Sequence, residues 1–150
     1  MGAADPRASC IGCDVVAGRV RPPGGVVWSD ERFVAYGFTD PSPVRGYLIL
    51  SSRRHVRGLY DLDAAEAAAL GPLLIRLQRA QVAALGADHA YVFVLGDKVP
   101  HFHAHVVPRF PDSPPNLRGG RIFQVTPADA RPVAELEAAG ATLAEALRRP

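Results

Sequence analysis

The chain has 150 residues, of which 48% are hydrophobic, and a formal net charge of +2. This length is enough for one domain with a real core, and the hydrophobic content argues against a disordered chain. The small net charge gives no basic field of the kind that attracts nucleic acid, and the apolar stretches are too short to span a bilayer. The N-terminus lacks a secretion-signal pattern, so we expect a cytoplasmic protein with neither nucleic-acid nor membrane partners.

The first third of the chain predicts a leader, a hairpin and a further strand. Residues 1–9 are expected to be a flexible leader. Val26–Trp28 and Phe33–Phe38 are short β-type runs on either side of a Ser-Asp-Glu turn, a pattern typical of a hairpin. A proline-containing loop then leads to a third strand at Tyr47–Leu50.

A long helix and two strands are predicted next. Leucine and alanine recur near the 3.6-residue helical period across residues 61–85, and Gly71-Pro72 within this run predicts a kink or a join between two helices. Tyr91–Leu95 predicts a strand, which a tight turn at Gly96-Asp97 connects to a second strand.

The tail predicts a loop and a C-terminal helix. Residues 111–120 read as an irregular loop because they are rich in proline and glycine. Thr126-Pro127 predicts a helix start with an N-cap and a proline at the first position, and the helix is expected to be interrupted near Pro132 or Gly140. Strands with short connections around one long helix favour an α+β fold with an antiparallel sheet and a C-terminal helix.

Three of the five histidines alternate along the last predicted strand, at His101, His103 and His105. Successive side chains of a strand point to opposite faces, so the three imidazoles line one face while Phe102 and Ala104 can pack on a core. Burying three such rings is costly, because each carries a donor and an acceptor that need partners. The pattern therefore favours proton transfer, nucleophilic attack or metal binding.

The stretch His101–Val107 resembles the signature of the histidine triad (HIT) family, which is His-x-His-x-His followed by two apolar residues. Trp28–Tyr36 resembles the family's first hairpin, and Arg45–Leu50 with the basic corner Arg53-Arg54-His55 resembles its next strand. The resemblance covers about residues 10–110, which we take as a HIT domain, with residues 111–150 as a loop and helical extension of the same domain. It implies an antiparallel sheet with helices on one side and a homodimer.

The resemblance also implies a role for each triad histidine. In HIT enzymes the central histidine attacks the α-phosphate of a nucleotide and forms a nucleotidyl-histidine that water hydrolyses, which corresponds here to His103. His105 would bind phosphate or leaving-group oxygens, and His101 would orient the nucleophile or bind zinc. Imidazole is a good nucleophile near neutral pH and leaves phosphorus readily. Because one ring nitrogen must be held by an acceptor, we expect a backbone carbonyl of this strand to bind His103.

The turn before the triad departs from the family pattern. HIT enzymes commonly carry Gly-Gln-Ser/Thr-Val there, with the polar pair touching phosphate, whereas this chain has Gly96-Asp97-Lys98-Val99. Lys98 is a candidate phosphate donor in place of the hydroxyl, and Asp97 would cap the turn or meet a hydroxyl or amine. The alternative is an ordinary solvated turn.

Other substrate contacts match the family less closely. Asp40 is a candidate for holding ribose, although it is one residue out of register, and Phe33 is a candidate for bordering the base. Tyr47 stands where the family usually has a histidine.

The only two cysteines, Cys10 and Cys13, have two residues between them. This spacing by itself fits buried or redox-active thiols as well as a metal site. A structural zinc site needs four ligands. In the CxxC-bearing branch of the HIT family the other two ligands correspond to His55 and His101. The resemblance therefore implies a structural zinc that fastens the N-terminal segment to the sheet, with no catalytic cofactor.

Three functions are weighed on these observations. The favoured one is a nucleotide hydrolase or transferase that acts on a purine nucleoside phosphoramidate, a mixed anhydride or a dinucleoside polyphosphate. The second is a non-catalytic zinc-bearing nucleotide binder or dimeric interaction module, which has no need of a nucleophile between two histidines. The third is a catalytic metal on the triad, although same-face strand neighbours are about 7 Å apart. A homodimer is also expected because the helix at residues 64–85 carries more apolar surface than one small sheet needs.

Overall fold

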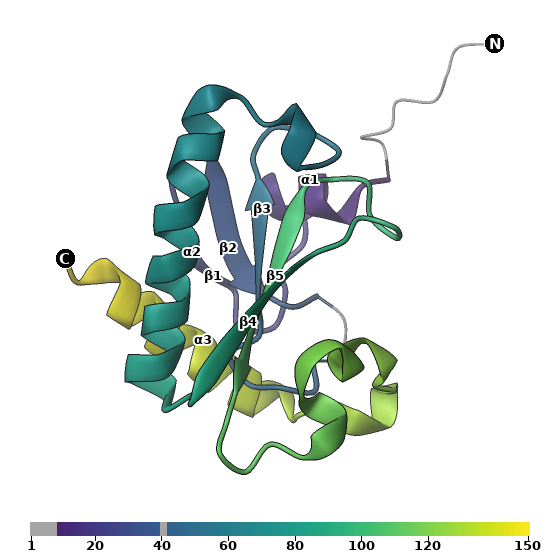
Figure 1. Ribbon diagram of the computed structural model, residues 1–150, viewed down its shortest axis with the longest axis vertical. Coiled ribbons are helices and arrows are strands. Elements are labelled where there is room, and N and C mark those ends of the chain that lie inside the picture. Colours follow the sequence, from purple (N-terminus) through teal and green to yellow (C-terminus); the bar gives the residue numbers. More distant parts are fainter. Residues whose placement is uncertain (1–8, 40–41) are drawn as a thin grey trace.

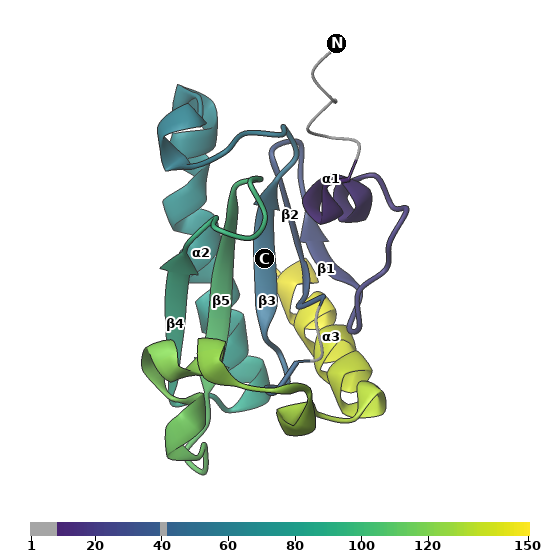
Figure 2. The same cartoon turned by 90° about the vertical axis from the view of Figure 1, so that its right-hand side faces the viewer.

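The computed structural model describes residues 9–39 and 42–150, so Asp40 and nearly all of the predicted leader lie outside the described residues. Within these described residues, five strands form one antiparallel sheet with the order β1-β2-β3-β5-β4 (Figures 1 and 2). The strands are β1 (Val26–Ser29), β2 (Phe33–Gly37), β3 (Leu48–Ser52), β4 (His89–Val94) and β5 (His103–Arg109). The antiparallel α+β class predicted from the sequence is confirmed.

The helices are α1 (Ile11–Val16), α2 (Ala64–Leu85) and α3 (Val133–Arg148). Short 3₁₀ turns lie at η1 (Leu59–Asp61), η2 (Pro115–Leu117), η3 (Gly119–Gln124) and η4 (Pro127–Asp129). Helices α2 and α3 cover one face of the sheet, whereas α1 and the segment after β5 lie against the other face (Figures 1 and 2). Within the described residues, none of the helices combines the length and apolar character that crossing a membrane requires.

Strand alternation divides the core into two clusters on opposite faces of the sheet. Leu50 and Ala104 belong to the cluster beneath α2 and α3, together with Phe102. Their neighbours on the same strands point the other way, so Ile49 and Val107 pack with α1 and the tail. His103 and His105 are on this second face because they alternate with Ala104 along β5.

Helix α2 is unbroken, so the predicted join at Gly71-Pro72 is wrong. The Asp63 carboxylate accepts a hydrogen bond from the Glu66 backbone N–H, and Glu66 returns the contact to the Asp63 N–H, which makes a capping box. A proline ring clashes with the backbone N–H and the Cβ of the residue before it when that residue is helical, and Gly71 lacks the Cβ. Burial of Leu73, immediately after the proline, then holds the helix on the sheet.

The C-terminal helix starts later than Thr126 predicts. Thr126 and Asp129 form a capping box, but it closes only the 3₁₀ turn η4, and α3 begins at Val133. Gly140 lies inside α3 and does not interrupt it. A Cβ at Gly140 would be 2.2 Å from the carbonyl oxygen of Gly24, so this glycine permits the close approach of α3 to the loop before β1.

Candidate active site and metal centre

The triad spans the start of β5 and the segment just before it. β5 begins at His103, which pairs with Ser51 of β3, and His105 pairs with Ile49 of β3 and with Phe93 of β4. His101 precedes the strand and is fully buried. The three histidines are therefore not equivalent, and only His103 and His105 belong to the strand face.

His103 has the hydrogen bond expected of a nucleophile. Its Nδ1–H donates to the backbone carbonyl of His101 at 2.6 Å. A neutral imidazole carries one hydrogen, so this bond leaves the lone pair on Nε2. The ring is half-buried and lines a cavity. The predicted carbonyl partner is thus present, and it belongs to another residue of the triad.

His105 is a buried neutral imidazole. The Tyr47 hydroxyl is hydrogen-bonded to its Nδ1 at 2.8 Å, so Nε2 is the ring nitrogen that can contact a ligand. Burial, and then the charge of His103, lower the pKa of His105 to about 4. The sequence marked Tyr47 only as a departure from the family pattern. In the fold its hydroxyl is a partner of the last triad histidine.

A cavity of about 40 Å³ lies beside the triad. All three triad histidines line it, as do Tyr36, Ser51 and, from α1, Gly12. The hydroxyls of Tyr36 and Ser51 are hydrogen-bonded at 2.8 Å. Burial raises the pKa of Tyr36 to about 12, so this hydroxyl stays protonated and can donate. The small volume suits a phosphoryl group, and the rest of a larger substrate would extend over the surface.

The other predicted substrate residues are only partly brought to this cavity. Asp97 and Lys98 are exposed in the connection between β4 and β5, where Gly96 adopts φ +118°, and Val99 is the residue of this turn that lines the cavity. The prediction that Phe33 borders the base is wrong. This residue is fully buried in the cluster beneath the helices, because its position on β2 points it to the face opposite the triad.

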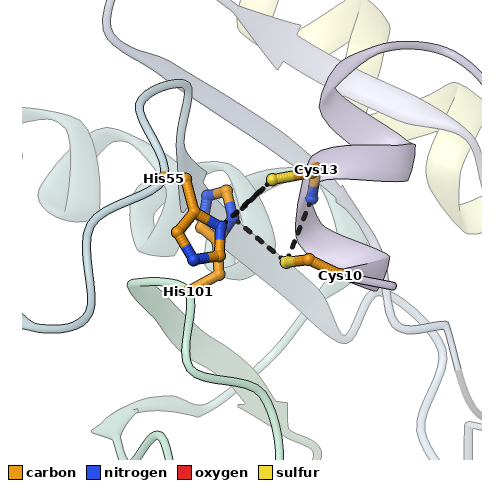
Figure 3. Close-up of side chains that lie close together, drawn as sticks. All are labelled: Cys10, Cys13, His55 and His101. Atoms are coloured by element: carbon orange, nitrogen blue, oxygen red, sulfur yellow. Dashed lines mark hydrogen bonds between the residues drawn. The ribbon is translucent and has the colours of Figure 1, made fainter. Parts of the chain in front are cut away.

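The four predicted metal ligands converge. The ligand atoms of Cys10, Cys13, His55 and His101 all lie within 4.8 Å of one another. Cys13 Sγ is 3.2 Å from His55 Nδ1, and Cys10 Sγ is 3.4 Å from His101 Nδ1. Figure 3 shows the two thiols of the α1 end pointing toward the two imidazoles, which come from separate loops.

The local structure of α1 explains the cysteine spacing. Cys10 is the N-cap, and its Sγ accepts a hydrogen bond from the Cys13 N–H at 3.4 Å, which brings both sulfurs to the same end of the helix. Gly12 between them packs against His101. A Cβ there would be 2.9 Å from both Cγ and Nδ1 of that ring, so only glycine fits. Sequence reasoning missed Gly12, because its requirement arises from a residue 89 positions away.

Backbone and charged partners hold the two imidazoles. His101 Nε2–H donates to the Ser52 carbonyl at 2.6 Å, which directs Nδ1 to the thiols. His55 follows Arg54, whose guanidinium donates to the buried Glu66 carboxylate at 2.7 and 2.6 Å. These bonds lower the pKa of Glu66, so the ion pair persists. The arrangement fixes the corner that carries His55.

The donor set fits a structural zinc ion. Two sulfurs and two imidazole nitrogens are the ligands of closed tetrahedral zinc sites, and the carbonyl on the far nitrogen of His101 is the usual outer partner of a ligating histidine. Burial, and then its contact with Cys10, raise the pKa of the Cys13 thiol to about 11. A cation at this point would stabilise the two thiolates, because metal binding displaces the thiol protons and supplies the compensating charge.

Solved structures of several organisms share this fold. A zinc-bound histidine triad family protein from Mycobacterium smegmatis is 24% identical, with a TM-score of 0.74 over 95% of this chain and 96% of that chain. A histidine triad nucleotide-binding protein from Sulfolobus tokodaii is 17% identical, with a TM-score of 0.73 over 93% and 92% of the two chains. A Hit-like protein from Bartonella henselae is 18% identical, with a TM-score of 0.72 over 96% and 99%.

The sequence itself carries the family pattern. No curated protein matches the chain as a relative. The sequence model of the HIT domain, however, matches residues 21–112, which is more than half of the chain and includes the complete triad. The chain is a member of the histidine triad family, with the CxxC and histidine cluster of its metal-binding branch.

Proposed function

We propose that the protein is a nucleotide hydrolase or transferase that attacks the α-phosphate of a purine nucleoside phosphoramidate, mixed anhydride or dinucleoside polyphosphate. One observation carries the proposal. His103 Nδ1–H is fixed on the His101 carbonyl at 2.6 Å, so its Nε2 lone pair is available at a phosphoryl-sized cavity. A ring held in this tautomer is ready to act as a nucleophile.

The reaction would take two displacements at phosphorus. The Nε2 lone pair of His103 forms a bond to the α-phosphorus while the bond to the leaving nitrogen or oxygen breaks, and the leaving group takes up a proton from water. Water then attacks the phosphorus, loses a proton and displaces His103, which releases the nucleoside monophosphate. His105 is neutral at pH 7 because its pKa is about 4. With the Tyr47 hydroxyl as donor to Nδ1, the single ring hydrogen is on Nε2, which would donate to a phosphate or leaving-group oxygen.

The three triad histidines are poorly arranged for a single catalytic metal. Nδ1 of His103 faces a carbonyl, Nδ1 of His105 faces Tyr47, and Nδ1 of His101 faces the cysteines. These contacts divide the triad between a metal cluster and a nucleophile. The contrast supports a structural role for the proposed zinc and phosphoryl chemistry without a catalytic metal.

The proposal is tested by AMP release from adenosine phosphoramidate and from diadenosine polyphosphates. We expect the wild type to turn over these substrates, and His103→Ala to lose turnover while it retains the fold. When the wild-type reaction is quenched without acid, a nucleotide should be found attached to His103. His89→Ala is the matched control, because His89 is an exposed histidine of the neighbouring strand β4. Nucleotide binding without release of AMP would instead support a non-catalytic binding module.

The metal, substrate contacts and compartment complete the proposal. The bound ion would be zinc, which fits the thiol and imidazole donors and is also the ion in the Mycobacterium smegmatis protein. Exposed Lys98 would contact a substrate phosphate, and Asp97 would contact a hydroxyl or amine of the substrate. We also propose that the protein is located in the cytoplasm.

The proposed assembly is a homodimer through α2 and β4. Ile75 and Val82 on the outer side of α2 are about half exposed, and β4 is an edge strand with Val92 and Val94 each 37% exposed. Register places both valines on the helical side of the sheet, since Val92 pairs with Val106 and Val94 with Ala104. A second copy would cover this apolar surface and the strand edge.

A further inference from the structure

An exposed aromatic ring stands beside the last triad histidine. Phe123 belongs to η3, which lies beyond residue 112, where the HIT match ends. Its ring centroid is 5.2 Å from that of His105 at an interplanar angle of 85°, and 5.0 Å from that of Phe93 at 83°. The residue is 41% exposed, so the ring is packed on two aromatic neighbours and still presents surface to solvent.

The position of Phe123 is fixed by the residue before it. Ile122 is 2% exposed and packs in the cluster that includes Val107 and Phe110. Figures 1 and 2 show the segment after β5 folded back against the same face of the sheet as α1. The buried isoleucine anchors η3, and the next side chain is thereby presented at the triad. An exposed large apolar ring beside a reactive group is informative, because most such rings are buried.

The two sides of the triad differ in chemistry. Toward β3 and β2 lies the cavity with the hydroxyls of Tyr36 and Ser51. Toward β4 lie the rings of Phe93 and Phe123, because Phe93 pairs with His105 across the ladder and Phe123 packs on both. In the proposed reaction the α-phosphorus carries a nucleoside and a leaving group, whose bond breaks as the bond to His103 forms, and we assign His105 to the side of the leaving group. The aromatic side is therefore the side that the leaving group encounters.

We propose that Phe123, supported by Phe93, stacks on a planar aromatic leaving group, so that the preferred substrates are nucleoside phosphoramidates of amines that bear an aromatic ring. This inference rests on the proposed function and adds the class of the leaving group. Stacked or edge-to-face ring pairs gain more than their buried area alone provides, whereas a saturated ring of the same size gains only the area.

The experiment compares two substrates that differ only in the aromaticity of the amine. These are the benzylamide and the cyclohexylmethylamide of AMP. The readout is the ratio of their kcat/KM values, so that a general effect on folding or on the nucleophile cancels. Phe123→Leu should lower the benzyl-to-cyclohexylmethyl ratio roughly three- to tenfold relative to the wild type. Phe123→Trp should preserve the ratio, because it keeps a ring at this position.

Tyr60→Leu is the matched control, since Tyr60 is a 78% exposed aromatic residue of η1 and does not belong to the triad strand or to η3. An unchanged ratio in Phe123→Leu would overturn the inference. The benzylamides of GMP and CMP provide a second test. If the effect of Phe123→Leu on kcat/KM depends on the nucleobase and not on the amine, Phe123 contacts the base and the inference is also overturned. If the wild type releases no AMP from either amide, or His103→Ala remains active, the proposed function fails instead.

Discussion

At the scale of single residues, the backbone and a tyrosine decide what each triad imidazole can do. His103 donates to a carbonyl, His105 is bonded to the Tyr47 hydroxyl, and His101 donates to the Ser52 carbonyl. Each bond occupies one ring nitrogen and directs the other. Three identical side chains in an alternating pattern therefore acquire three different environments, which suit the proposed nucleophile, the proposed hydrogen-bond donor and a metal ligand.

The buried neutral His105 predicts a pH-dependent stability. Its pKa is about 4 in the fold, against about 6.5 in an unfolded chain, so the unfolded state binds more protons between these values. The free energy of unfolding should therefore fall as the pH drops through this window, by about 2 kcal/mol between pH 7 and pH 5 from this group. Urea unfolding at the two pH values measures the loss.

The variant His105→Gln should lose correspondingly less stability over the same pH range, because it cannot be protonated. Its metal ligands are unchanged, so any acid-induced loss of metal is common to both proteins. His89→Gln, which removes an exposed histidine, should behave like the wild type. Equal losses in the wild type and His105→Gln would contradict the prediction.

At the scale of elements, α1 is a short helix whose place on the sheet depends on the metal cluster and on Gly12. It has six residues, too few to be stable alone, and it contributes Cys10 and Cys13 to the cluster. His101 in turn offers its carbonyl to His103, so one residue belongs to the metal cluster and also holds the proposed nucleophile. A disturbance at α1 should reach the active site by this route.

We predict that Gly12→Ala weakens the metal site. The new Cβ would be 2.9 Å from the His101 ring, which must move away from the thiols. The purified wild type should hold about one zinc per chain, as a four-ligand site requires, and a chelator should lower its melting temperature. Gly12→Ala should contain less zinc and respond less to the chelator.

Gly120→Ala is the control, because a Cβ at Gly120 would have no neighbour within 4 Å in the part of the chain that the structure describes. Elemental analysis of all three proteins, purified without added metal, gives the zinc content. A wild type free of zinc, with both thiols titratable in the folded state, would rule out the site. Full zinc content in Gly12→Ala would show that the close contact does not control it.

At the scale of the whole molecule, the sheet is covered on both faces but has an apolar flank. The helical face is buried beneath α2 and α3, and the triad face is partly closed by α1 and the tail. The flank formed by the outer side of α2 and the edge strand β4 exposes Ile75, Val82, Val92 and Val94. This surface is the one that the proposed homodimer would bury.

Charge placed on this flank should separate the dimer. We expect the wild type to sediment at twice the chain mass at micromolar concentration, and Ile75→Glu combined with Val82→Glu to sediment as a monomer, because burying two carboxylates in an apolar contact is costly. Val133→Glu is the control, since Val133 is 61% exposed on α3. A wild type that remains monomeric across this concentration range would refute the assembly.

Local patterns were sufficient for much of the fold and for the chemistry of the site. The short β-type runs Val26–Trp28 and Phe33–Phe38 on either side of a polar turn predicted the hairpin, and the 3.6-residue period predicted α2. The triad and the resemblance named the four residues that converge as metal ligands. These features depend on side-chain periodicity or on short spacings, which a single sequence displays directly.

Contacts between distant segments decided the rest. The face on which Phe33 lies, the partner of Tyr47 and the requirement for glycine at position 12 depend on strand register and on how α1 packs. Phe123 reaches His105 only because the tail folds back over the sheet. The sequence by itself determined which residues could carry the chemistry. The tertiary structure decided which ring nitrogen and which aromatic face each one presents, because hydrogen-bond partners and packing neighbours are set by the approach of strands and helices that are far apart in the chain.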